Sequence, residues 1–129
     1  MLKSGILNPY INSLLSRVRH TNTLVIADRG FPFWPALETV DIALIDDVPT
    51  VLQVLNAILL NFNVGEVMMA DEFKGHNTVE TQALFSSTLG SLPVQYIPHV
   101  NFKQKVPEAI GLIRTGDTTQ YANMILVSA

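Results

Sequence analysis

Apolar residues along the chain follow two alternating patterns, one with the period of a helix and one with the continuity of a buried strand. Asn8 and Pro9 form a pair that favours the start of a helix. The apolar face that follows them consists of Ile11, Leu14, Leu15 and Val18. A second helix is predicted from Pro49 to about residue 62, with a polar stripe so narrow that most of it should be buried.

Short apolar runs rich in β-branched residues predict strands between these helices. They cover residues 24–27, 40–45, 64–70, 94–97, 110–114 and 124–127. Further helices are expected over 77–90, where Asn77 and Glu80 have capping-box spacing, and over 101–106. The alternation predicts an α/β fold with a largely parallel central sheet flanked by helices. No repeat or linker divides residues 1–129, so a single domain is expected.

Composition excludes several classes of protein. The 129 residues include no cysteine, which excludes disulfide frameworks, cysteine-based metal clusters and thiol nucleophiles. Eight basic against 11 acidic residues, without a basic stripe, argue against a nucleic-acid partner. The apolar stretches are far shorter than a bilayer requires, and the first residues do not resemble a signal peptide. We therefore expect a cytoplasmic protein with no membrane partner.

The charged fraction changes this picture in one respect. Only 15% of the residues are charged, whereas about a quarter is usual in a globular domain. A chain of this kind has apolar surface left over, and self-association is one way to cover it.

Candidate chemistry gathers where the predicted strands end. Asp28, the pair Asp71-Glu72 and His99 each follow a strand, and ligands of parallel sheets bind beyond the carboxyl ends of strands. His20 precedes the strand that leads to Asp28, and Lys103 follows His99 by one helical turn. These placements suggest an imidazole, a carboxylate and an ammonium at one edge of the sheet. Each has a simpler reading, since His20 suits a helix end and Asp28 suits a turn.

Motifs for covalent, nucleotide or metal chemistry are missing. The chain has no G-x-S-x-G, P-loop or G-x-G-x-x-G motif, and its three histidines lack the close spacing of a metal site. We therefore expect no metal and no cofactor. Tyr121-Ala122-Asn123 offers an aromatic face and an amide, which suit a sugar ring, although a turn before the last strand is the more common explanation of such a tripeptide.

Three segments together resemble the RbsD/FucU family of sugar-ring isomerases and mutarotases, in particular its D-ribose pyranase branch. The first joins Ser4-Gly5-Ile6-Leu7-Asn8 to His20 and to Asp28-Arg29-Gly30-Phe31-Pro32. The second joins Val48-Pro49 and Gln53-Val54-Leu55 to Asp71-Glu72 and to Lys74 through His76-Asn77. The third joins His99 and Phe102-Lys103 to Ile113-Arg114-Thr115-Gly116-Asp117 and Tyr121-Ala122-Asn123. These segments cover nearly the whole chain.

The resemblance implies an isomerase that interconverts cyclic forms of a reducing monosaccharide, D-ribose above all, without a cofactor. It implies that His20 is the catalytic proton donor. The residues that it places around the sugar are Asp28, His99, Lys103, Tyr121, Ala122 and Asn123. It also implies a homo-oligomer, a pentameric ring or a decamer of two rings, with sites between neighbouring subunits.

Some positions depart from the family pattern. Arg19 and Asn22 replace the usual Gly and Asp, and Arg29 replaces a small residue, so that its guanidinium could pair with Asp28 or meet an acidic group of the ligand. Phe31-Pro32 also resembles the fucose-mutarotase branch. An anomer mutarotase of the L-fucose type and a non-catalytic sugar-binding or transport-associated protein therefore stay open as alternatives.

Overall fold

Six strands form one mixed sheet in the computed structural model, which describes residues 1–129, with the strand order β2-β5-β1-β6-β3-β4. Five strands run parallel, and β6 lies antiparallel between β1 and β3. The strands are β1 Thr23–Ala27, β2 Thr39–Asp41, β3 Val64–Ala70, β4 Val94–Ile97, β5 Gly111–Arg114 and β6 Met124–Ser128. The prediction of a largely parallel sheet flanked by helices is confirmed.

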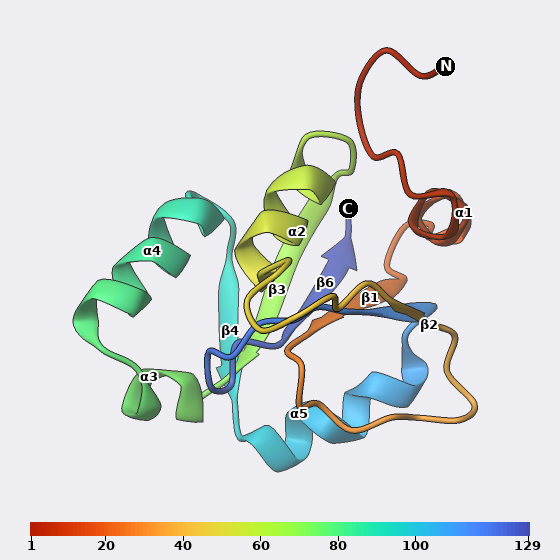
Figure 1. The fold of residues 1–129 in the computed structure, drawn as a ribbon. Helices are drawn as coiled ribbons and strands as arrows, with labels where there is room; N and C mark the ends of the chain where they lie inside the picture. Colours follow the sequence, from red (N-terminus) through yellow and green to blue (C-terminus); the bar gives the residue numbers. More distant parts are fainter.

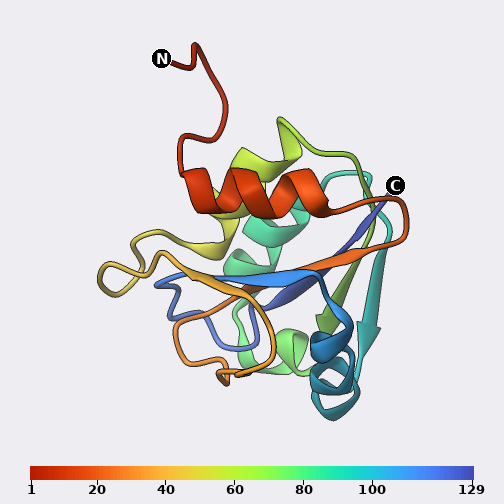
Figure 2. The ribbon, with the colours of Figure 1, turned by 90° about the vertical axis from the view of Figure 1, so that its right-hand side faces the viewer.

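Helices cover both faces of this sheet (Figures 1 and 2). They are α1 Pro9–Arg17, α2 Val51–Leu59, α3 Glu72–His76, α4 Val79–Leu89 and α5 His99–Lys105, which a 3-10 turn, Val106–Glu108, prolongs. Helices α1, α2 and α4 share one apolar core with the sheet, whereas α5 and the loop from residue 28 to 38 belong to the core on the opposite face.

Alternation along β1 divides the two cores. Leu24 and Ile26 point to the α2 side, and Val25 and Ala27 point to the α5 side, all of them fully buried. A strand buried on both faces reads as a continuous apolar run, which is the pattern that the sequence shows here. Burial of this kind fixes the register of β1 and therefore the position of its last residue, Ala27, from which the chain enters the loop.

The helix predicted over 77–90 begins at a different cap. Thr78, and not Asn77, caps α4, because its side chain accepts a hydrogen bond from the backbone N–H of Thr81. The amide of Asn77 donates instead to the carbonyls of Phe73 and Gln120, 2.8 and 2.9 Å away. Asn77 therefore ties α3 to the segment before β6.

Three other elements differ from expectation. The strand predicted over 40–45 ends at Asp41, because the chain turns away and pairs Ile45 with Val48. Residues 72–76, for which no helix was predicted, form α3. The helix predicted over 101–106 begins earlier, at His99, whose backbone N–H donates to the carboxylate of Glu72.

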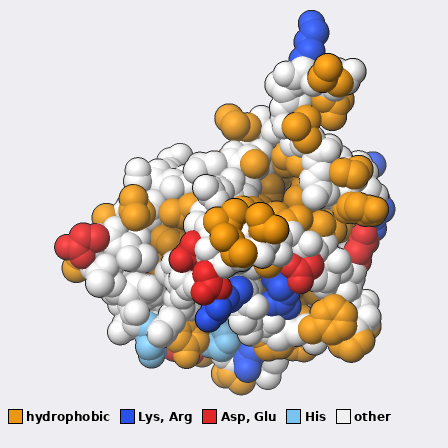
Figure 3. Space-filling view, in the orientation of Figure 1, with side chains coloured by type: hydrophobic (Ala, Val, Ile, Leu, Met, Phe, Trp, Pro, Cys, Tyr) orange, Lys and Arg blue, Asp and Glu red, His pale blue; other side chains and the backbone are white.

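Apolar side chains stay exposed on this single chain. Figure 3 shows hydrophobic atoms along the N-terminal arm and in the middle of the face that it presents. Exposed large apolar residues include Leu2, Leu7, Leu44, Ile45, Val48 and Leu60. No helix has the length and hydropathy that crossing a membrane demands.

Gly116 allows close backbone contact between the segment after β5 and the loop before α2. A Cβ at this position would lie 2.3 Å from the carbonyl oxygen of Ile45 and 2.9 Å from that of Val48. We expect Gly116→Ala to lower the free energy of unfolding by about 1–3 kcal/mol, measured by urea denaturation, since backbone must move to admit the methyl group. Gly75→Ala is the control, because a Cβ there meets nothing within 4 Å. Equal stability of the two variants would contradict this close contact.

Candidate functional site

Polar residues from three parts of the chain meet at one edge of the sheet. This edge is formed by the carboxyl ends of the five parallel strands and by the amino end of β6. Asp28 follows β1, His99 follows β4, and Asn123 precedes β6. The reversed direction of β6 is what places its first residues at this edge.

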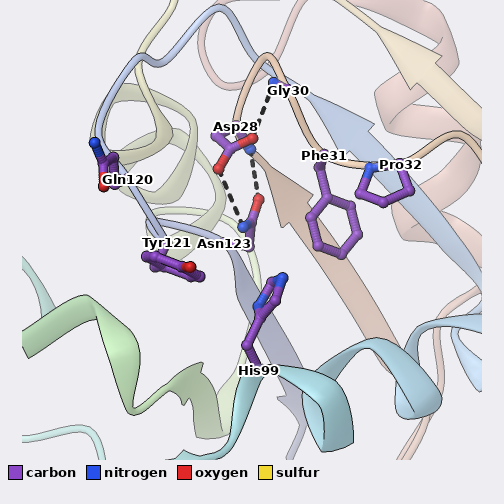
Figure 4. Close-up of a pocket in the computed structure, with 8 residues that line it drawn as sticks. All are labelled: Asp28, Gly30, Phe31, Pro32, His99, Gln120, Tyr121 and Asn123. Atoms are coloured by element: carbon purple, nitrogen blue, oxygen red, sulfur yellow. Dashed lines mark hydrogen bonds between the residues drawn. The ribbon is translucent and has the colours of Figure 1, made fainter. Parts of the chain in front are cut away.

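Asp28 and Asn123 form a two-point contact across the joint between β1 and β6 (Figure 4). The backbone N–H of Asp28 donates to Oδ1 of Asn123 at 2.7 Å, and Nδ2 of Asn123 donates to Oδ2 of Asp28 at 3.1 Å. The other carboxylate oxygen accepts from the backbone N–H of Gly30 at 3.0 Å. Burial nevertheless raises the pKa of Asp28 above its usual value.

His99 enters the pocket from the first turn of α5. Its backbone N–H donates to both carboxylate oxygens of Glu72, 3.0 and 3.1 Å away, which fixes where the helix begins. The imidazole packs edge-on against Phe31, with ring centroids 6.2 Å apart, and its Nδ1 is buried without a hydrogen-bond partner. Burial, and then the ammonium of Lys103, lower the pKa of His99. The neutral imidazole is thereby favoured near neutral pH.

Tyr121 forms the next wall of the pocket. Its ring stands 5.0 Å from the ring of His99 and 4.8 Å from that of His76. The residue has φ +56°, a left-handed conformation that is uncommon for a side chain of this size. Strained backbone of this kind concentrates at functional sites.

The pocket between these residues has a volume of about 310 Å³, at the small end of the range for ligand sites. Its lining consists of Asp28, Gly30, Phe31, Pro32, His99, Gln120, Tyr121 and Asn123. Four of these residues were given no site role from the sequence: Gly30, Phe31, Pro32 and Gln120. The signal was their position, since Gly30, Phe31 and Pro32 lie within four residues after Asp28 and Gln120 directly precedes Tyr121.

Two of the three other hollows illustrate chemistry less suited to a polar ligand. One of about 220 Å³ beside α2 is lined almost entirely by apolar side chains. Another, of about 370 Å³, contains the carboxylates of Asp47 and Asp117, which already accept hydrogen bonds from Thr118, Val51 and Thr119. No three His, Asp or Glu side chains in the chain gather as metal ligands would.

His20 lies at the opposite end of β1 from Asp28. It is exposed in the turn before this strand, and Asn22 closes the turn by accepting a hydrogen bond from the backbone N–H of Arg19. Five strand residues separate the two ends, a span of roughly 16 Å. The expectation that His20 and Asp28 share one edge of the sheet is therefore wrong within a single chain.

The chain is similar to known proteins over its full length. A model of the RbsD / FucU transport protein family matches residues 1–129. The chain belongs to the RbsD/FucU family. Relatives named D-ribose pyranase include one from Geobacillus kaustophilus, 39% identical over 99% of this chain and 93% of the relative. Another, from Escherichia coli O81, is 35% identical over 98% of this chain and 96% of the relative.

Solved structures of the RbsD/FucU family have the same fold. Bacillus subtilis RbsD, complexed with D-ribose, matches with a TM-score of 0.92 and 31% identity over 100% of this chain and 98% of that one. The fucose mutarotase from Streptococcus pneumoniae, in complex with L-fucose, matches with a TM-score of 0.83 over 99% and 98%. Its identity is only 18%, so this second likeness concerns the fold alone.

The remaining predicted positions of this RbsD/FucU family member do not line the pocket. Lys103 lies one turn after His99 on α5 and acts on it through charge. Ala122 is fully buried in the core on the α2 side. Arg29 pairs with Asp46 at the surface and not with Asp28.

The charge effect of Lys103 on His99 is testable by titration. We expect Lys103→Met to raise the pKa of His99 toward its ordinary value without reaching it, because burial is the larger cause of the lowered pKa. NMR titration of the imidazole Cε1–H signals measures this shift. Lys105→Met removes the same charge two residues further along α5 and should leave the midpoint in place. An unmoved His99 midpoint in Lys103→Met would remove Lys103 from the electrostatics of the pocket.

Proposed function

We propose that this chain is a D-ribose pyranase, which interconverts the pyranose and furanose forms of D-ribose without a cofactor. The observation that carries the proposal is the pocket in which the Asp28–Asn123 pair, the imidazole of His99 and the ring of Tyr121 converge. Full-length relatives named D-ribose pyranase and the similarity to RbsD complexed with D-ribose support the choice of sugar.

The reaction requires proton transfers at two oxygens. A proton leaves the anomeric hydroxyl, the bond between the anomeric carbon and the ring oxygen breaks, and the ring oxygen takes up a proton. Attack of another hydroxyl on the open aldehyde reverses these transfers and gives the other ring size. A general acid–base group with a pKa near neutrality can serve both directions.

Hydrogen-bonding groups of the pocket suit the orientation of a sugar. The carboxylate of Asp28 accepts from hydroxyls, and the imidazole of His99 lines the same pocket. Tyr121 adds an aromatic face for the C–H side of the ring. Positioning of the reacting hydroxyls lowers the barrier in itself. Lys103 and Ala122 belong to the proposed substrate-binding set from the family resemblance.

Proton transfer is assigned in this proposal to His20 of a neighbouring copy. His20 is exposed on a turn at the far edge of the sheet, where only a second chain can bring it to a pocket. A homo-oligomer with shared sites, a pentamer or a decamer, is therefore part of the proposal. A cytoplasmic location stays a prediction from the sequence.

The second candidate is an anomer mutarotase of the L-fucose type. Phe31 and Pro32, which resemble the fucose branch, both line the pocket. A panel of aldoses in an NMR ring-exchange assay separates the candidates, because ribose pyranose–furanose exchange and fucose anomer exchange give different crossing signals. Binding without accelerated exchange of any sugar would favour the non-catalytic alternative.

We expect His20→Ala to reduce ring exchange of D-ribose by roughly 10²- to 10⁴-fold, the usual contribution of general acid–base catalysis. Its fold should persist, since the side chain is exposed. Saturation-transfer NMR measures the rate, and Ser16→Ala, an exposed change on α1, is the control. Wild-type activity of the His20→Ala variant would exclude His20 as the proton donor. Loss of activity in His99→Ala alone would instead assign the role of proton donor to His99.

The working unit is expected to contain at least five subunits, as the resemblance implies, and light scattering at micromolar protein measures this number. Mixing His20→Ala chains with Asp28→Ala chains tests site sharing. If one neighbour supplies His20, about a quarter of the sites in a mixed ring regain both groups. A fully active monomer, or mixtures no more active than their components, would refute the shared site.

A further inference from the structure

We propose that Arg114 is a positioning residue, whose buried guanidinium holds the loop of residues 28–32 in the shape that forms one wall of the sugar pocket. This inference rests on the proposed function, since it assigns to that pocket the residue that keeps it in shape. Arg114 itself does not line the pocket.

Register places Arg114 beside the start of this loop. Arg114 is the last residue of β5 and pairs with Ala27, the last residue of β1. On its other side it pairs with Asp41 of β2. The guanidinium therefore lies at the edge of the sheet where the chain leaves β1 for the pocket.

Three carbonyl groups of the loop accept hydrogen bonds from Arg114. Its Nη1 donates to the carbonyls of Asp28 and Arg29, both at 3.3 Å, and its Nη2 donates to that of Pro32 at 3.2 Å. No backbone N–H donates to any of these carbonyls. A planar fork with several donors can hold carbonyls at both ends of a short loop at once, whereas a lysine ammonium cannot.

The guanidinium of Arg114 lies closer to the carbonyls of the loop than to any carboxylate. Only 8% of the residue is exposed, and the nearest carboxylate oxygen, on the mostly exposed Asp41, is 3.8 Å from its Nε. Buried cations need partners, and carbonyl dipoles are the closest ones here. Loss of the guanidinium would leave the three carbonyls without donors, and the loop would lose its fixed shape.

Four of the five residues in this loop line the pocket, the exception being Arg29. Phe31 packs edge-on against the ring of His99, Pro32 lines the same pocket, and the carbonyl of Asp28 is one of the groups that Arg114 holds. Movement of the loop would therefore displace the sugar from the catalytic groups. A displacement of about 1 Å reduces kcat/KM by up to about 100-fold.

The decisive variant is Arg114→Met in the full-length assembled protein. We expect faster hydrogen–deuterium exchange of residues 29–34 without sugar, and a KM for D-ribose raised about tenfold or more with a smaller change in kcat. Arg114→Lys keeps the charge without the fork, so its loop exchange and KM should lie between those of Arg114→Met and the wild type. The Arg114→Lys variant also tests the positioning role if Arg114→Met does not fold.

Two controls separate positioning from general destabilisation. Ile113→Val shortens a fully buried side chain on the opposite face of the same strand, and Lys105→Met removes an exposed charge. Both should keep the wild-type KM and loop exchange. Folded Arg114 variants with wild-type loop exchange and KM would overturn the inference, as would a KM raised equally in Ile113→Val.

The two proposals fail in different ways. A wild-type protein that accelerates no ring exchange overturns the proposed function, and sugar-free exchange of the loop still reports on Arg114. An active wild type whose loop is unaffected by Arg114→Met overturns the role of Arg114 alone.

Discussion

Two hydrogen bonds between Asn123 and Asp28 join chain segments that are 95 residues apart, and the pocket depends on this joint. The joint exists because β6 runs antiparallel between β1 and β3, so that its first residues lie beside the last residues of β1. A parallel β6 would place Asn123 at the far edge of the sheet. Since Asn123 is only 3% exposed, its amide has few competing partners and holds Asp28 in one orientation.

Burial then sets the electrostatic character of the pocket. It raises the pKa of Asp28 and lowers the pKa of His99, so the same desolvation opposes charge on both groups. The hydrogen bonds from Gly30 and Asn123 act in the other direction on Asp28 and favour its carboxylate. A site that limits charge and offers directed acceptors suits a neutral sugar, whose hydroxyls need partners and supply no counter-ion.

Sequence patterns predicted the fold and much of the site because buried strands have a continuous apolar signature and polar residues mark where they end. Asp28 and His99 were found in this way. The direction of β6 was not predictable, since the run 124–127 has the same pattern in either direction. Placement along the sequence suggested that His20 and Asp28 share one edge of the sheet, although the strand between them puts the two at opposite edges. Arg114 lay in a segment of the family resemblance but received no role, because its partners are carbonyls of a distant loop and carry no side-chain pattern.

Opposite placement of His20 and the pocket also limits the symmetry of an assembly in which they meet. A contact between the His20 turn of one chain and the pocket of another joins two different surfaces. Repetition of such a head-to-tail contact gives a ring where the rotation closes, with one shared site at each interface. A dimer with two-fold symmetry would instead have to form two such contacts, each between a His20 turn and a pocket, across one axis. Apolar residues exposed on the single chain, among them Leu44 and Ile45, supply surface of the kind that permanent interfaces bury. Where His20 of a neighbour completes the pocket, as proposed, a closed ring completes every pocket in the same way.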